Sequence, residues 1–261
     1  MSPPALTDVE RPRISVSHIY AWGVHLYTAM GLVVAGAIAY VLVSDDPLRF
    51  RDAFLLMAVG LIIDGTDGWF ARRVRVKEVL PGFDGRRLDD LVDFLNYTFL
   101  PLLLIYQADL LPERQSGWLL VPLVASAYGF CQVSAKTDDG FFLGFPSYWN
   151  LVAFYLYALQ LPVWATVTIL LSLAALTFVP ARYLYPTQPG ALNRISIILG
   201  GVWGAFMIAI LWRWEDAPFG GAAARQLTLV SLFYPAYYML VSWALSVRYW
   251  LARARMRDRI T

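Results

Sequence analysis

Four aspartates stand at helical spacing within an otherwise apolar part of the chain. Asp64 and Asp67 are three residues apart, and Asp89 and Asp93 are four apart, so each pair lies on one face of a helix. A carboxylate at the centre of a bilayer costs about 2.5–3.5 kcal/mol, and such residues mark functional sites. Carboxylates without Cys or His nearby in the sequence favour Mg²⁺ or Mn²⁺ over zinc. The pattern predicts a site for two divalent ions and a phosphate group.

Small and basic residues accompany the first pair. Gly68 and Ala71 follow Asp64 by four and seven residues, on the same helical stripe, and let a bulky group approach the backbone. Arg72 can neutralise a phosphate. The carboxylates could instead pair with neighbouring arginines, or they could form an ion pathway in a transporter. Asp90 points about 100° away from Asp89, so we expect it outside the metal site.

The composition is that of a membrane protein. Of 261 residues, 59% are hydrophobic and only 15% are charged, whereas soluble domains carry about a quarter charged residues. The net charge of +2 gives no reason to expect a nucleic-acid partner. The single cysteine, Cys131, excludes an intrachain disulfide. We therefore predict an all-α, polytopic integral membrane helical bundle.

Eight apolar runs approach the roughly 20 residues that a spanning helix needs. They are 19–43, 50–73, 88–111, 117–135, 147–161, 163–180, 192–213 and 226–250. Only Pro162 separates the fifth from the sixth, which form either a tight hairpin or one kinked element. We expect a single membrane domain over 1–261, with a cytoplasmic or interfacial lead-in at 1–18 and a basic cytoplasmic tail at 251–261.

Basic residues predict the orientation. With both termini in the cytoplasm, only five of the 21 Lys and Arg residues fall on the opposite side of the membrane. These five are Arg49, Arg51, Arg114, Arg213 and Arg225. The aspartates then lie toward the cytoplasmic ends of the second and third spans, so the site faces the cytoplasm.

The aspartate segment resembles the signature of the CDP-alcohol phosphotransferases. That signature reads Asp, two residues, Asp-Gly, two residues, Ala-Arg, a spacer, Gly, three residues, Asp, three residues, Asp. The matching positions are Asp64, Asp67, Gly68, Ala71, Arg72, Gly85, Asp89 and Asp93. The spacer of 12 residues, 73–84, is longer than the family usually has.

Two further runs, 74–81 and 142–150, are similar to those of bacterial phosphatidylcholine synthases, and the second also resembles a motif of phosphatidylserine synthases. The resemblance implies an enzyme of the bacterial cytoplasmic (inner) membrane that joins choline to CDP-diacylglycerol and releases CMP. It implies a homodimer among membrane lipids and two Mn²⁺ or Mg²⁺ ions, with Mn²⁺ favoured. Serine, inositol or glycerol phosphate as the acceptor, a transporter and a non-catalytic scaffold remain as alternatives.

The family motif also implies a role for each matching residue. The metal ligands would be Asp64, Asp67, Asp89 and Asp93. The nucleotide pocket would comprise Asp64, Asp67, Gly68, Ala71, Arg72 and Gly85. Asp93 would also act as general base for the choline hydroxyl.

Choline is a quaternary ammonium, which aromatic faces recognise. The chain has 10 Trp, 15 Tyr and 15 Phe. Many combinations of these residues could form such a cage, so its position is hard to predict from the sequence. The candidates, all expected on the cytoplasmic side, are Tyr148, Trp149, Asn150, Tyr183 and Tyr185; Phe94 and Tyr97 are weaker ones. Arg182 and Arg194 could bind a lipid phosphate, although membrane topology alone also explains them.

Overall fold

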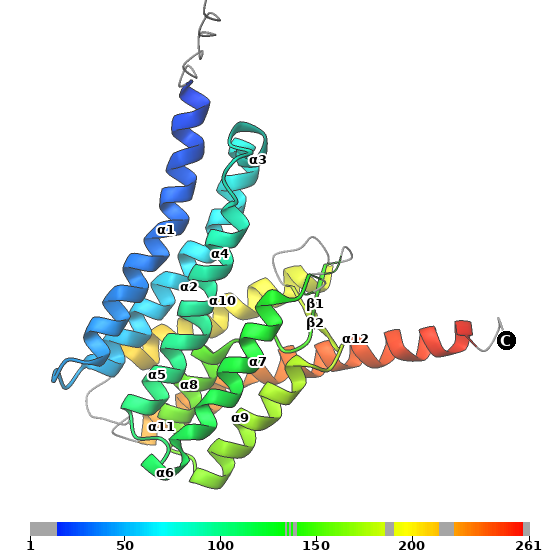
Figure 1. Cartoon of the computed structure of the whole chain (residues 1–261). Coiled ribbons are helices and arrows are strands. Elements are labelled where there is room, and N and C mark those ends of the chain that lie inside the picture. Colours follow the sequence, from blue (N-terminus) through cyan, green and yellow to red (C-terminus); the bar gives the residue numbers. More distant parts are fainter. Residues whose placement is uncertain are drawn as a thin grey trace, which may run out of the picture.

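Two long helices, α1 (Val16–Leu42) and α2 (Arg49–Val74), lie side by side as an antiparallel pair (Figure 1). α2 ends at Arg75, whose left-handed backbone (φ 54°) turns the chain into the short helix α3 (Val76–Val79). The structure is a computed structural model that describes residues 15–133, 135, 137, 140–185, 191–213 and 222–257. Most of the expected lead-in and the end of the basic tail therefore lie outside the described residues.

The aspartate-bearing third segment is continuous from α4 (Gly85–Asp93) through η1 (Phe94–Phe99) to α5 (Leu100–Gln107). The carboxylate of Asp84 caps its start by accepting the N–H groups of the second and third residues of α4. The stretch η1 is π-helical. Pro101 explains it in part, because proline has no N–H to bond the carbonyl four residues earlier. Such bulges are frequent at functional sites, and this one starts directly after Asp93.

Shorter helices complete the middle of the chain. They are α6 (Glu113–Ser116), the 3₁₀ turn η2 (Gly117–Leu119), α7 (Leu120–Cys131), α8 (Trp149–Leu159) and α9 (Val163–Thr177). α8 ends at Gln160 in a left-handed conformation (φ 46°), and Pro162 precedes α9. The fifth and sixth expected spans are therefore two separate helices joined by a turn.

The C-terminal part consists of α10 (Ala191–Trp212), α11 (Ala222–Ser231) and α12 (Phe233–Arg257). α11 passes into α12 after a single residue. Pro235 accounts for this break, because it cannot donate to the carbonyl four residues earlier. The end of α12 projects beyond the bundle (Figure 1).

A two-stranded antiparallel sheet joins β1 (Phe141–Leu143) to β2 (Arg182–Leu184). Hydroxyl groups of α12 cover the outer edge of β2. Ser246 accepts the N–H of the first strand residue at 2.7 Å, and Ser242 accepts that of the last at 3.1 Å. Tyr238 donates to the carbonyl of the last residue at 2.9 Å. Because these three positions are spaced by four, one face of α12 satisfies the strand edge.

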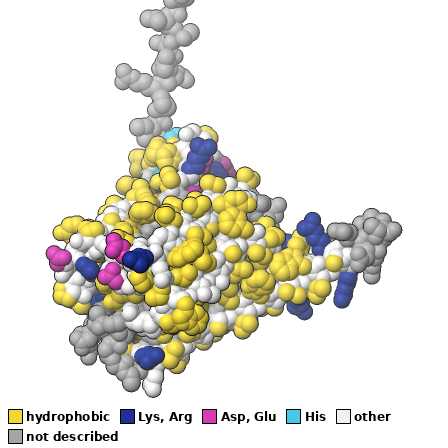
Figure 2. Space-filling view, turned by 60° about the horizontal axis from the view of Figure 1, so that its bottom comes forward, with side chains coloured by type: hydrophobic (Ala, Val, Ile, Leu, Met, Phe, Trp, Pro, Cys, Tyr) yellow, Lys and Arg dark blue, Asp and Glu magenta, His cyan; other side chains and the backbone are white. Residues whose placement is uncertain are grey.

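Four helical stretches are long and apolar enough to cross a membrane: Val16–Leu42, Arg49–Val74, Leu192–Trp212 and Ala224–Arg255. Trp149–Leu159 and Val163–Thr177 are apolar but shorter. Hydrophobic side chains cover most of the face in Figure 2, and charged ones gather toward its margins. The predicted polytopic membrane bundle is confirmed. The number of eight spans is not, and it stays a prediction, as do the orientation and the single domain.

Candidate active site

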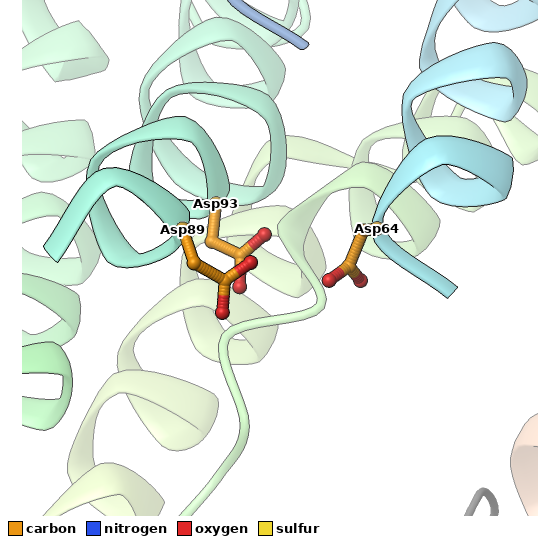
Figure 3. Close-up of side chains that lie close together, drawn as sticks. All are labelled: Asp64, Asp89 and Asp93. Carbon is orange, nitrogen blue, oxygen red and sulfur yellow. The ribbon is translucent and has the colours of Figure 1, made fainter. Parts of the chain in front are cut away.

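The carboxylates of Asp64, Asp89 and Asp93 converge between two helices (Figure 3). Each provides an oxygen atom, and these atoms all lie within 4.8 Å of one another. Asp89 and Asp93 project from one face of α4, and Asp64 approaches from α2. All three side chains are half-buried. Oxygen ligands brought together from two rigid helices suit a hard divalent cation.

Asp67 lies outside this group of three. It is buried, and its Oδ2 accepts a hydrogen bond from the Thr28 hydroxyl of α1 at 2.8 Å. The structure thus brings together three of the four predicted ligands, and metal binding by Asp67 stays a prediction. Asp90 also lies outside the group, as its direction predicts, yet it lines the adjoining cavity.

Tyr97 holds Asp64 from the opposite segment. Its hydroxyl donates to Asp64 Oδ2 at 2.6 Å, and its side chain is 7% exposed. Tyr97 lies in η1, four residues after Asp93, so the widened turn presents both groups to the same site. The four-residue spacing between Asp93 and Tyr97 is the feature of the sequence that could have predicted that both side chains face the same site. The sequence indicates Tyr97 only as a weaker candidate for choline, whereas the structure places it as a partner of a predicted metal ligand.

The predicted nucleotide-binding residues of small size each have a close neighbour. A Cβ atom on Gly68 would lie 3.3 Å from Nη1 of Arg72, so the guanidinium folds back over the glycine. Ala71 packs against a small apolar cluster between α1 and α3. A Cβ atom on Gly85 would lie 2.5 Å from Cε1 of His25. Their part in nucleotide binding stays a prediction.

A cavity of about 660 Å³ adjoins the carboxylates. One part of its wall combines Asp64 and Asp93 with tyrosine side chains. The tyrosines are Tyr97, Tyr148, Tyr155, Tyr185, Tyr234 and Tyr238. Another part is apolar and formed by α8 and α9 and the turn between them, including Leu159, Leu161 and Leu173. A mostly apolar cavity with a few convergent polar groups is typical of a small-molecule or lipid site.

The predicted choline residues divide into two sets. Tyr148, Asn150 and Tyr185 line the cavity. Trp149 and Tyr183 are fully buried and are not among the described lining residues. The Trp149 indole donates instead to the Ser126 hydroxyl at 2.7 Å, in the core behind the cavity.

The structure adds aromatic residues that the sequence did not indicate. The ring of Tyr148 lies 6.4 Å from that of Tyr97 and 5.9 Å from that of Tyr238, centroid to centroid. Tyr234, one helical turn before Tyr238, also lines the cavity. These residues of α12 follow Tyr148 by some 90 positions, and no local pattern marks them.

The predicted lipid-phosphate residues, Arg182 and Arg194, are not among the described residues that line the cavity. The Arg182 guanidinium lies 3.6 Å from the ring centroid of Tyr249 and 5.2 Å from that of Phe141. These cation–π contacts tie the sheet to α12. Arg194 is exposed on α10. Phosphate binding by either residue stays a prediction.

Comparison with known proteins identifies the family. No protein-family model matches the chain. A phosphatidylcholine synthase of Pseudomonas aeruginosa is 40% identical over 184 residues, which cover 70% of this chain and 76% of that protein. The synthases of Legionella pneumophila and Agrobacterium fabrum are 36% and 34% identical over 74% of this chain, covering 75% and 79% of their own lengths. The chain therefore belongs to the phosphatidylcholine synthase family.

Proposed function

We propose that this protein joins free choline to CDP-diacylglycerol, producing phosphatidylcholine and CMP. Family membership supports the overall reaction. The observation that carries the assignment to this site is the convergence of Asp64, Asp89 and Asp93 beside a tyrosine-lined cavity. In the reaction the choline oxygen bonds to the phosphatidyl phosphorus while the bond from that phosphorus to the CMP oxygen breaks.

The carboxylate group fits a divalent metal, because its donors are oxygen atoms only and lie close together. Asp64, Asp89 and Asp93, joined by Asp67, would hold two ions, and Mn²⁺ rather than Mg²⁺ is the proposed species. When bound, such ions offset the charge of the pyrophosphate and of the departing CMP.

The remaining steps belong to side chains of this protein. Asp93 lines the cavity next to the tyrosines, where its carboxylate accepts the proton of the choline hydroxyl. Arg72, exposed at the end of α2, binds a phosphate of the nucleotide. Gly68 and Gly85 belong to the nucleotide pocket in this proposal: the first lets the Arg72 guanidinium lie close to α2, and the second lets α4 approach His25 of α1.

Tyrosine rings bind the choline cation in this proposal. Tyr148 and Tyr185, both predicted from the sequence, are joined by Tyr238, and Asn150 provides a polar group at the same wall. The faces of aromatic rings attract a quaternary ammonium, which offers no N–H to donate. Trp149 and Tyr183 support this wall from the core.

The apolar helices and the bacterial relatives support a location in the bacterial inner membrane. We place the active site on the cytoplasmic side, because the predicted orientation puts most Lys and Arg residues on the same side of the membrane as the aspartates. A homodimer and lipid-phosphate binding by Arg182 and Arg194 belong to the same proposal.

The test is CMP release by the purified protein in nanodiscs that contain CDP-diacylglycerol and Mn²⁺. Choline, serine, inositol and glycerol 3-phosphate are supplied separately. Release with choline alone would support the proposal. CMP release with another alcohol would support phosphatidyl transfer and contradict choline as the acceptor. No CMP release with any of the four alcohols would contradict the proposed reaction and favour a transporter or a scaffold.

Tyr148→Leu is expected to raise the KM for choline roughly tenfold, because a cation–π contact contributes about 0.5–2 kcal/mol. Leucine keeps apolar volume at the cavity wall and removes the ring. The measurement is initial CMP release against choline concentration. Tyr128→Leu is the matched control, since Tyr128 is exposed on α7 and contacts Phe178. An unchanged KM in Tyr148→Leu would remove this residue from the choline site.

Tyr97→Phe is expected to weaken Mn²⁺ binding by about 10–100-fold, the usual cost of losing a hydrogen bond to a metal ligand. The substitution removes the 2.6 Å bond to Asp64 and little volume. Free Mn²⁺ measured by electron paramagnetic resonance gives the affinity without turnover. Tyr106→Phe, at an exposed position on α5, is the control. Equal Mn²⁺ affinity in Tyr97→Phe and the unaltered protein would show that Tyr97 does not position Asp64.

A further inference from the structure

Asp90 is a half-buried residue of α4 that has no part in the reaction proposed above. It lines the cavity but lies outside the group of three carboxylates that suits a metal ion. Among the described residues, its carboxylate has no partner in a hydrogen bond or an ion pair. Carboxylates that are partly removed from water normally have such a partner, so an unpaired one in a cavity wall is a candidate partner for a bound cation.

The side of the third segment that faces the cavity is a single helical stripe. Its lining residues are spaced by four, three and four positions, and they are Arg86, Asp90, Asp93 and Tyr97. Residues at this spacing are neighbours on one face of a helix. Asp90 is therefore adjacent to Asp93, the proposed base, about one turn nearer the start of α4. Arg86, one further turn away, forms no ion pair with Asp90 in the described part of the chain.

Aromatic rings form another wall of the same cavity. Phe142 of β1 and Tyr185, directly after β2, lie with their ring centroids 4.5 Å apart. Both line the cavity, together with Tyr148 at the start of α8. The cavity thus combines ring faces from one part of the chain with the carboxylate of Asp90 from another. Both kinds of group attract a quaternary ammonium, the rings through their quadrupole and the carboxylate through its charge.

We propose that the carboxylate of Asp90 is the counterion of the choline ammonium and selects a cationic acceptor. This inference rests on the proposed function, because it takes choline as the acceptor and Asp93 as its base. Choline carries its ammonium two carbon atoms from its hydroxyl group, and Asp90 and Asp93 are neighbours on one helical face. One choline molecule can therefore present its hydroxyl to Asp93 and its cation to Asp90, while tyrosine rings contact its methyl groups.

A carboxylate at this position discriminates among acceptor alcohols. In a mostly apolar cavity, opposite charges attract and like charges repel more strongly than in bulk water. Asp90 would repel the carboxylate of serine and the phosphate of glycerol 3-phosphate, and inositol offers no positive charge to pair with it. Repulsion of this kind is one way in which a binding site rejects a competitor.

The test compares choline with 3,3-dimethylbutan-1-ol, the neutral alcohol in which a carbon atom replaces the nitrogen of choline. CMP release is measured with each acceptor in nanodiscs with CDP-diacylglycerol and Mn²⁺. We expect Asp90→Asn to lower kcat/KM for choline at least tenfold, mainly through KM, because the buried charge pair is lost. The value for the neutral alcohol should not change. Glu78→Gln, which alters an exposed carboxylate on α3 outside the cavity, is the control.

An equal loss with both acceptors would show that Asp90 has a structural role, and it would overturn the proposal. A lower Mn²⁺ affinity in Asp90→Asn, measured by electron paramagnetic resonance, would assign the residue to the metal site and also overturn it. Asp90→Ser covers the case in which Asp90→Asn does not fold. It must lose the preference for choline over the neutral alcohol, whereas Asp90→Glu must keep that preference.

Binding of labelled choline, measured without CDP-diacylglycerol, separates this inference from the proposed function. We expect choline affinity to fall at least tenfold in Asp90→Asn and to be unchanged in Glu78→Gln. Choline binding that depends on Asp90, in a protein that makes no phosphatidylcholine, would support the cation site and contradict the proposed reaction. Synthesis of phosphatidylcholine with the same choline KM in Asp90→Asn as in the unaltered protein would support the reaction and contradict the cation site.

Discussion

Replacing Asp93 with asparagine is expected to lower CMP release on the order of 10²–10⁴-fold, the contribution of a positioned general base. An amide cannot accept the proton of the choline hydroxyl, and it is a poor substitute for a carboxylate next to a divalent ion. Asp93 also lines the cavity, so the substitution acts where acceptor and carboxylate group meet. The measurement is single-turnover CMP release in nanodiscs with saturating choline and Mn²⁺.

A comparison with Asp89→Asn separates the two roles of these carboxylates. Asp89 belongs to the same group of three and has no assigned role as base, so raising the Mn²⁺ concentration should restore part of its activity. The same excess should not restore Asp93→Asn. Asp52→Asn, at a surface position paired with Arg51, is the control. CMP release close to normal in Asp93→Asn would reject this residue as the base.

Helical spacing made the carboxylate site predictable from the sequence. Residues three or four apart share a helical face, and two such pairs separated by one loop must belong to neighbouring antiparallel helices. The convergence of Asp64 with Asp89 and Asp93 follows from that. The position of Asp67 does not, because its partner Thr28 lies 39 residues away on α1 and no local pattern links the two.

The aromatic wall was only partly predictable, for two physical reasons. Tyr148 lies just before α8 and has a non-helical backbone (ψ 54°), so no helical spacing relates its direction to that of Trp149, and it faces the cavity while Trp149 turns into the core. A residue that is next in sequence to a cavity-lining aromatic residue therefore need not line the cavity itself. Tyr238 reaches the same wall only because hydroxyl groups of α12 bind the edge of β2, a tertiary contact between distant segments.

The segment that leads to Tyr148 in this wall contains Gly144, and its conformation supports a prediction about the stability of the protein. This residue connects β1 to α8 and has φ +83°, a left-handed conformation that costs other residues about 1–2 kcal/mol. A Cβ atom there would also overlap the backbone carbonyl oxygen of Thr177 at the end of α9. The N–H groups of Gly144 and Phe145 donate to the carbonyls of Ala181 and Leu176. The segment that contains Gly144 therefore cannot move away from the end of α9 without losing these hydrogen bonds.

Gly144→Ala is therefore expected to destabilise the protein by about 2–5 kcal/mol, since overpacking adds roughly 1–3 kcal/mol to the backbone cost. The measurement is the midpoint of thermal unfolding in detergent, followed by intrinsic fluorescence. Gly36→Ala is the matched control, because a Cβ atom at that exposed position on α1 meets no atom within 4 Å. An unfolding midpoint unchanged from the parent would contradict the close approach of the backbone to α9.

Any Gly144→Ala protein that remains folded should show a second effect, on choline. The chain runs from Gly144 through Ser147, which holds a strained φ of 56° and is 3% exposed, directly to Tyr148. A shift of the backbone away from α9 would move that ring, while the carboxylates on α2 and α4 would keep their positions. We therefore expect a raised KM for choline with Mn²⁺ affinity unaltered, which separates this wall of the cavity from the metal site.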